Sequence, residues 1–334
     1  MSKYVLFSVL LIAIASCNGQ EKKINGASFV ASRVNVDSTH TTPLVDKINA
    51  NYAAVMPFGF FRDLENPIIH HNSKRQWFGE RRGGTKQYAE ALRKHHIKIM
   101  IKPQLWIGHG TYTGHIEMTS DSLWKQFEDS YTDFILVYAD LAQEINADIL
   151  CIGTELEKFV EKRPEYWNGL IKKIRKTYKG KLTYAANWDE FKRTPFWSQL
   201  DYIGIDAYFP ISDAQTPTVQ QSMEGWKAHV PVIKALSDKE KKPILFTEYG
   251  YRSVDFSGKE PWRYDRSMTG VNLQAQVNIT KALYETFWDK EWFAGGFIWK
   301  WFVNYKESGG ETNNQYTPQN KPVEKIIKHY YSLN

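Results

Sequence analysis

The chain has 334 residues, of which 42% are hydrophobic and 24% are charged, and its formal net charge is +6. These proportions are typical of a globular protein and exclude extensive disorder, and the length suffices for one large domain or two ordinary ones. Lysine and arginine are interleaved with aspartate and glutamate, so no basic run indicates a nucleic-acid groove and we expect no nucleic-acid partner. The chain is rich in aromatic residues, with 12 Trp, 19 Tyr and 18 Phe.

Residues 1–16 have the features of a signal peptide. The apolar run Tyr4–Ala15 is too short to span a bilayer comfortably. It leads into Ile14-Ala15-Ser16-Cys17, which resembles the lipobox of bacterial lipoproteins. The resemblance implies cleavage before Cys17, a lipid anchor on Cys17 and a tether over residues 17–23. It also implies export to a bacterial membrane, and we expect the outer membrane or the cell surface. An ordinary secretory signal is the alternative.

Strand-like and helix-like segments alternate over residues 24–334. The predicted strands are Ile24–Val30, Tyr52–Pro57, Ile97–Lys102, Ile149–Thr154, Lys181–Ala186, Tyr202–Ala207, Pro243–Thr247 and Gly295–Trp301. The predicted helices are Gly84–His96, Ser120–Ile145, Pro164–Tyr178, Ser222–Leu236, Leu273–Trp288 and Val323–Leu333. This alternation predicts an α/β protein with a single (β/α)₈ TIM barrel over residues 24–334. A doubly wound sheet is the main alternative, but it would more often show a glycine-rich fingerprint after an early strand, and the sequence has none.

Two of the predicted strands end in a glutamate. Ile149–Thr154 is followed by Glu155, and Pro243–Thr247 is followed by Glu248. Both are continuous apolar runs bounded by breakers, which is typical of strands buried on both faces. A carboxylate beside such a strand is unfavourable unless another group pairs with it or uses it. Because the chemistry of a barrel lies at the C-terminal ends of its strands, Glu155 and Glu248 predict a two-carboxylate active site, with Glu157 as the competitor of Glu155.

The other predicted strand ends carry amide, basic and aromatic side chains. We expect these side chains to bind substrate, and they are Lys102, Trp106, Asn187, Trp188, Tyr208 and Trp299. Two of them have open alternatives. Lys102 could orient a substrate hydroxyl or neutralise a nearby acid, and Trp299 could belong partly to the core, as could Trp301.

Six short motifs in this order resemble glycoside hydrolase family 113, a clan A family composed mostly of β-1,4-mannanases. They are Phe58-Gly59-Phe60, Lys102-Pro103-Gln104, Gly153-Thr154-Glu155, Asn187-Trp188, Asp206-Ala207-Tyr208 and Thr247-Glu248-Tyr249-Gly250. The resemblance extends from Ile24 to the C-terminus. Clan A barrels place the acid/base glutamate after strand four and the nucleophile after strand seven. Counting the predicted strands puts Glu155 and Glu248 at these two places.

The resemblance implies hydrolysis with retention of anomeric configuration. Glu248 would be the nucleophile, kept ionised by hydrogen-bond donors such as Tyr208, and Glu155 would be the acid/base, kept protonated by burial and by the neighbouring charge. Trp299 would be the apolar floor at the cleavage point. Trp106, Trp188 and Trp262 are candidates for flanking subsites. The chain departs from many clan A enzymes at Thr154, where they have an asparagine that binds the sugar 2-hydroxyl.

The resemblance implies β-mannan or manno-oligosaccharide as the substrate, with another β-glycan as the alternative. A surface barrel that binds glycan without cleaving it is the alternative from a different class, although a pure binder has no use for two carboxylates at those strand ends. We expect no cofactor and no metal, because the paired histidines have neither HExxH nor carboxylate–histidine spacing. A serine hydrolase would show a G-x-S-x-G elbow, which is absent from the sequence.

Overall fold

The computed structural model describes residues 22–264 and 269–333. The predicted signal peptide and Cys17 lie outside these residues. Lys23, which the sequence analysis placed in the tether, is buried, and its ammonium donates to the carbonyl oxygens of Lys290 (2.6 Å) and Phe293. The barrel therefore includes Lys23. Within the described ranges, none of the helices has the length and apolar character needed to cross a membrane.

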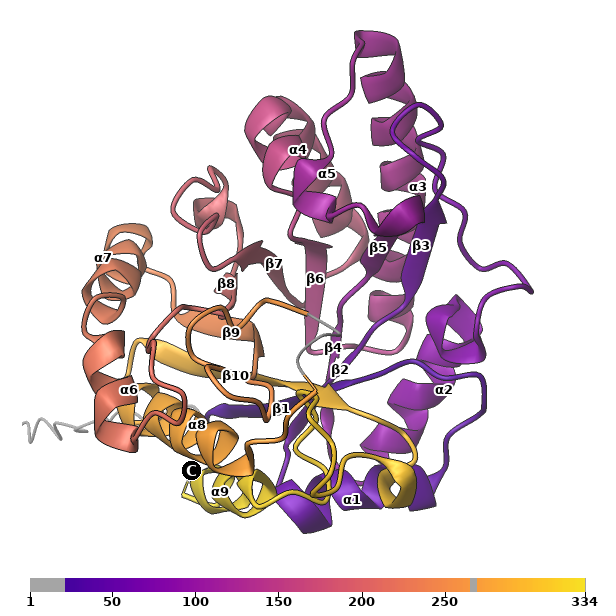
Figure 1. Ribbon diagram of the computed structural model, residues 1–334. Coiled ribbons are helices and arrows are strands. Elements are labelled where there is room, and N and C mark those ends of the chain that lie inside the picture. Colours follow the sequence, from indigo (N-terminus) through magenta and orange to yellow (C-terminus); the bar gives the residue numbers. More distant parts are fainter. Residues whose placement is uncertain (1–21, 265–268, 334) are drawn as a thin grey trace, which may run out of the picture.

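Eight parallel strands close into a barrel, which confirms the predicted fold (Figure 1). In chain order they are β1 (Ile24–Phe29), β2 (Tyr52–Val55), β4 (Lys98–Ile101), β6 (Ile149–Thr154), β7 (Lys181–Asn187), β8 (Ile203–Asp206), β9 (Ile244–Tyr249) and β10 (Phe293–Trp301). β1 closes the barrel by pairing with β10 on one side and β2 on the other. Buried side chains from strands along the whole chain, including Met100 of β4, Leu245 of β9 and Phe297 of β10, form one cluster. These short apolar strands, buried on both faces, are what the sequence pattern predicts.

Nine α-helices are described, and most of them connect consecutive barrel strands. They are α1 (Ser38–Ile48), α2 (Arg82–Arg93), α3 (Asp121–Glu144), α4 (Glu157–Lys162), α5 (Pro164–Thr177), α6 (Val219–Trp226), α7 (Val230–Glu240), α8 (Leu273–Phe287) and α9 (Val323–Tyr331). The single helix predicted over Ser222–Leu236 is wrong. The chain breaks between α6 and α7 because Pro231 lies in the first turn of α7, where its missing N–H is tolerated, and it could not continue α6.

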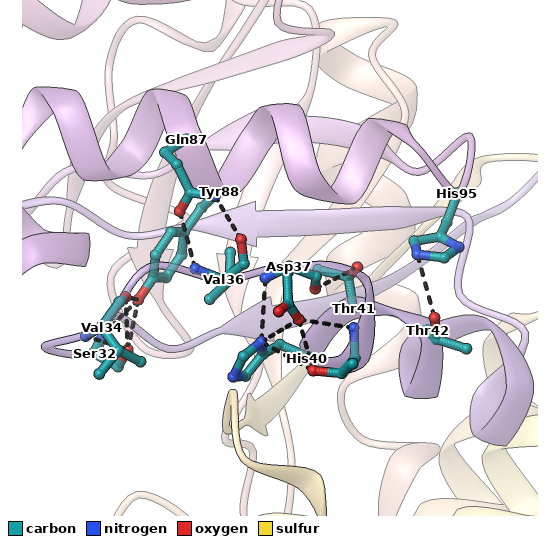
Figure 2. Close-up of polar contacts among 11 residues, drawn as sticks. Ser32, Val34, Val36, Asp37, His40, Thr41, Thr42, Gln87, Tyr88 and His95 are labelled. Atoms are coloured by element: carbon teal, nitrogen blue, oxygen red, sulfur yellow. Dashed lines mark hydrogen bonds and ion pairs between the residues drawn. The ribbon is translucent and has the colours of Figure 1, made fainter.

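The loop after β1 is held in place by α2 (Figure 2). The Tyr88 hydroxyl of α2 donates to the carbonyl oxygen of Val34 (2.9 Å), and the Val36 N–H donates to the Gln87 side chain (3.0 Å). The loop ends at Asp37, which caps α1 by accepting a hydrogen bond from the Thr39 N–H (2.9 Å). These contacts fix the wall of the barrel mouth beside β2.

Two further strands, β3 (Phe58–Phe61) and β5 (Gln104–Ile107), continue β2 and β4 beyond the barrel and form a two-stranded parallel ribbon (Figure 1). Pro57 separates β2 from β3, and Pro103 separates β4 from β5. Proline lacks the N–H of a ladder bond, so both strands leave the barrel at the same level. Neither strand was predicted from the sequence, and Trp106, expected just after the end of the strand Ile97–Lys102, lies on β5.

Candidate active site

Glu248 lies near the end of β9, and three donors surround its carboxylate. Tyr208 donates its hydroxyl to Oε2 (2.8 Å), which is the contact expected from the sequence. Gln104 donates its amide to Oε1 (3.2 Å), and the ammonium of Lys102 also donates to Oε1. Hydrogen bonds from charged and oriented donors hold a carboxylate in one position and favour its negative charge.

Lys102 bridges Glu248 and a second carboxylate, Asp206. Lys102 and Asp206 are both fully buried, and the Lys102 Nζ lies 3.2 and 3.3 Å from the two Asp206 oxygens. Burial opposes the ammonium charge, but Asp206 and Glu248 outweigh it and raise the pKa of Lys102. Of the two alternatives that the sequence left open for Lys102, the structure favours neutralisation of nearby acids, because its ammonium is fully buried between Asp206 and Glu248.

Asp206 is the buried partner that the sequence analysis did not single out. Thr247 donates its hydroxyl to Asp206 Oδ1 (2.8 Å). Burial, followed by the charge of Glu248, raises the pKa of Asp206 to about 7, while Lys102 lowers it. The site thus holds two carboxyl groups around one cation.

Glu155 follows β6 on the facing side of the barrel and is half-buried. Burial raises its pKa well above the ordinary value, and the charges of Asp206 and Glu248 raise it further. Glu155 has a left-handed backbone (φ 50°), and its N–H donates to the carbonyl oxygen of Ala185 (2.8 Å). A non-glycine residue in this conformation costs about 1–3 kcal/mol, and such strain is common at functional sites. Glu155 therefore holds its proton more tightly than an ordinary glutamate does, and the charge of Glu248 is one of the causes.

A buried network supports the backbone next to Glu155. The Leu156 N–H donates to the Tyr184 hydroxyl (2.7 Å), and this hydroxyl donates to Glu190 Oε1 (2.6 Å). Oε2 of Glu190 accepts from the Asn187 N–H (3.0 Å). Glu190 is 1% exposed, and its burial raises its pKa to about 8. Sequence reasoning missed Tyr184 and Glu190, because neither lies at a predicted strand end.

Glu190 gives the protein a pH-dependent stability that Glu190→Gln should remove. A carboxyl whose pKa is about 8 in the folded state and lower in the unfolded state binds a proton more tightly when folded. The protonated carboxyl therefore contributes fully to the free energy of unfolding below about pH 4. This contribution is lost as the pH rises to about 8, by up to about 1.4 kcal/mol per pH unit. We expect denaturant unfolding between pH 5 and 8 to show a flatter free-energy profile for Glu190→Gln than for the wild type. Parallel profiles would contradict this assignment.

Aromatic and amide side chains flank the two glutamates. Asn187 donates its amide to the Tyr112 hydroxyl (3.0 Å), and the pKa of Tyr112 is raised by burial and then by the charge of Glu155. Trp188 stacks on Trp262, with ring centroids 4.9 Å apart. Tyr112 thus joins the predicted Asn187–Trp188 pair near Glu155, although no sequence signal indicated it.

The remaining candidates occupy different parts of the molecule. Trp299 is half-buried, and the ammonium of its neighbour Lys300 lies 5.4 Å from the Trp299 ring centroid. Trp301 is fully buried and belongs to the core. Trp106 is 55% exposed on the ribbon. Glu157, the competitor of Glu155, begins α4 and forms an ion pair with Arg193, so it is already partnered outside the site.

The departure from the family pattern at Thr154 has a structural consequence. The Thr154 hydroxyl oxygen is buried at the end of β6. It therefore does not offer a donor to a sugar in the cleft, as an asparagine amide would.

In residues 22–264 and 269–333, no group of three or more His, Cys, Asp or Glu side chains is arranged to hold a metal ion.

Solved structures share this fold over nearly the whole chain. A GH113 β-1,4-mannanase solved as a complex is 22% identical, with a TM-score of 0.81 over 94% of this chain and 100% of its own. The GH113 β-mannanase AaManA from Alicyclobacillus acidocaldarius, in complex with ManMIm, is 22% identical, with a TM-score of 0.81 over 93% of this chain and 98% of its own. A Faecalibacterium prausnitzii β-glucuronidase is 13% identical, with a TM-score of 0.61 over 95% of this chain and 50% of its own.

Comparison of the sequence with curated proteins gives no significant match, whereas comparison with protein-family models gives one. The model of Glycoside Hydrolase Family 113 matches residues 37–321, which include every barrel strand except β1. The chain therefore belongs to glycoside hydrolase family 113 and is a glycoside hydrolase.

Proposed function

We propose that this glycoside hydrolase cleaves β-1,4-linked mannan or manno-oligosaccharides by double displacement, with Glu248 as nucleophile and Glu155 as acid/base. The observation that supports it most is the contrast between the two carboxyl groups. Glu248 is bound by Lys102, Gln104 and Tyr208, whereas burial and neighbouring charge hold the pKa of Glu155 well above its ordinary value. Two nearby carboxyl groups with opposite protonation are what a retaining glycosidase needs.

In the first step, an oxygen of Glu248 attacks the anomeric carbon and the glycosidic C–O bond breaks. Glu155 gives its proton to the departing oxygen, which leaves as a hydroxyl. In the second step, Glu155 accepts a proton from water, the water oxygen attacks the anomeric carbon, and the bond to Glu248 breaks. Each glutamate thus returns to its starting state, and the product keeps the anomeric configuration of the substrate.

The choice of mannan is supported by the mannanases with which the chain shares its fold, and by the family. The same chemistry on another β-glycan is the second candidate. A barrel that only binds glycan is disfavoured, because Lys102, Gln104 and Tyr208 orient a single buried carboxylate. This arrangement suits a reacting group better than a binding surface.

We expect the purified protein to release oligosaccharides from mannan or glucomannan, and more slowly or not at all from cellulose and xylan. Product analysis by chromatography measures this, and NMR of the first product reports its anomeric configuration. Release of the opposite anomer would contradict double displacement. Binding of a glycan without cleavage would support the binding-protein alternative.

We further propose that the protein is exported and anchored by a lipid on Cys17. This proposal rests on the lipobox-like sequence Ile14–Cys17 alone. Metabolic labelling with a fatty-acid analogue should label the wild type and leave Cys17→Ser unlabelled. Equal labelling of the two proteins would exclude this anchor.

A further inference from the structure

The ribbon formed by β3 and β5 has one buried face and one aromatic face. Side chains alternate between the two faces of a strand. Phe61 and Ile107 face inward and are 3% and 2% exposed. On the other face, Phe60 is half-buried and Trp106 is 55% exposed. No core packing explains why these rings lie outward.

The strand register aligns three rings in one row. Phe60 is in register with Trp106 of β5 and also pairs with His70 in an antiparallel bridge. The Phe60 N–H donates to the His70 carbonyl (2.9 Å), and the His70 N–H donates to the Phe60 carbonyl (2.7 Å). Residues directly opposite on paired strands share a face, and neighbouring strands lie about 4.8 Å apart. The row Trp106–Phe60–His70 therefore extends over about 10 Å.

This row continues the surface that begins at Glu248. Gln104, which donates to Glu248 (3.2 Å), lies on the same face of β5 as Trp106 and two residues before it. Two residues of a strand advance about 6.6 Å. Since Gln104 contacts the proposed nucleophile, a chain that leaves the reaction centre along β5 meets Trp106 first and Phe60 next.

A cavity of about 840 Å³ lies at the far end of the row. Its lining includes Phe60, His70, Gln76 and Trp77. Trp77 is 43% exposed, and the Arg33 guanidinium lies 5.3 Å from its ring centroid. Arg33 belongs to the loop that α2 holds in place, so this wall is supported from behind. The cavity combines apolar ring surface with amide and imidazole groups that can reach hydroxyls.

We propose that the row Trp106–Phe60–His70 and the cavity beside Trp77 form a subsite for the glycan chain that extends away from the cleavage point. This proposal rests on the proposed function and extends it from Trp106 to Phe60, His70 and Trp77, none of which was among the predicted substrate-binding residues. The ligand class is a β-linked pyranose chain, whose apolar ring faces stack on aromatic side chains and whose hydroxyls bond to polar ones. The subsite makes cleavage depend on chain length.

The test is a chain-length comparison between β-1,4-mannotriose and mannohexaose. For the full-length protein, we expect Phe60→Ala and His70→Ala each to lower kcat/KM on the hexasaccharide by about 3- to 10-fold. On the trisaccharide the loss should be much smaller, because the short chain covers less of the row and does not extend to the cavity. Val232→Ala removes an apolar side chain of comparable exposure (42%) from α7 and should reduce neither value. Equal losses on both substrates, or no loss on the hexasaccharide, would overturn the subsite.

If the proposed function is wrong, the wild type itself will cleave neither oligosaccharide, which differs from the outcomes that would overturn the subsite. If the wild type cleaves neither oligosaccharide, the subsite is tested by affinity electrophoresis in gels that contain soluble glucomannan. Slower migration of the wild type that is lost in both His70→Ala and Phe60→Ala would support it. Identical migration of all proteins would overturn it.

Discussion

Glu248→Gln is expected to lower kcat on β-1,4-mannan by at least about 10³-fold while leaving glycan binding intact, because an amide cannot form the glycosyl-enzyme. Glutamine keeps the shape of the side chain and an oxygen that can accept from Tyr208, whose hydroxyl lies 2.8 Å from the carboxylate. Initial rates of reducing-sugar release measure the loss, and calorimetric titration with mannohexaose measures binding. A variant that retains more than a tenth of the wild-type kcat would exclude Glu248 as nucleophile.

Glu155→Ala should behave differently, and the difference separates the two roles. Without its acid, the enzyme should show a kcat/KM on mannan that is lower by about 10²- to 10⁴-fold. On a dinitrophenyl glycoside, whose leaving group needs no proton, kcat/KM should fall much less. On that substrate the second step then lacks its base, so a covalent sugar adduct of Glu248 should accumulate and be visible by mass spectrometry. Equal losses on the two substrates would show that Glu155 does not donate the proton.

The barrel and the positions of Glu155 and Glu248 at its strand ends were predictable because each depends on local sequence. Short apolar runs bounded by breakers identify strands that are buried on both faces, and strand ends identify where chemistry occurs. Glu155 and Glu248 satisfied both conditions. The ion pair of Lys102 with Asp206 joins residues 104 positions apart, so no spacing in the sequence indicated it.

Other features were missed for physical reasons that can be named. The sequence of α1 contains Pro43 and four Ser or Thr residues, which are weak helix formers, and the helix depends on the Asp37 cap and on burial of Leu44 and Ile48. β3 and β5 are only four residues long and follow prolines, so their own sequence does not distinguish them from loops. In both cases tertiary packing outweighs local propensity.

Lys102→Met should destabilise the protein by about 3–5 kcal/mol, because it leaves buried Asp206 and Glu248 facing each other without a cation. The deficit should grow as the pH rises. Without the ammonium, one of the two carboxyl groups must keep a proton in the folded state, and the pKa of Asp206 is already raised to about 7 by burial and Glu248. A group that is protonated in the folded state and ionised in the unfolded state contributes less stability at each higher pH. Denaturant unfolding at pH 5 and pH 8 measures both effects.

Two controls separate this buried charge from lysine in general. Lys125→Met removes an ammonium from an ion pair with Asp129 whose side chains are 70% and 64% exposed, and such pairs contribute at most about 1 kcal/mol. Adding Asp206→Asn to Lys102→Met removes the second charge and should restore part of the lost stability and most of its pH independence. Two outcomes would contradict this role of Lys102: Lys102→Met destabilises the protein no more than Lys125→Met does, or the double variant is less stable than Lys102→Met. In either case the ammonium of Lys102 would not be what holds the two carboxylates together. The site would then depend on the hydrogen bonds from Tyr208, Gln104 and Thr247 instead.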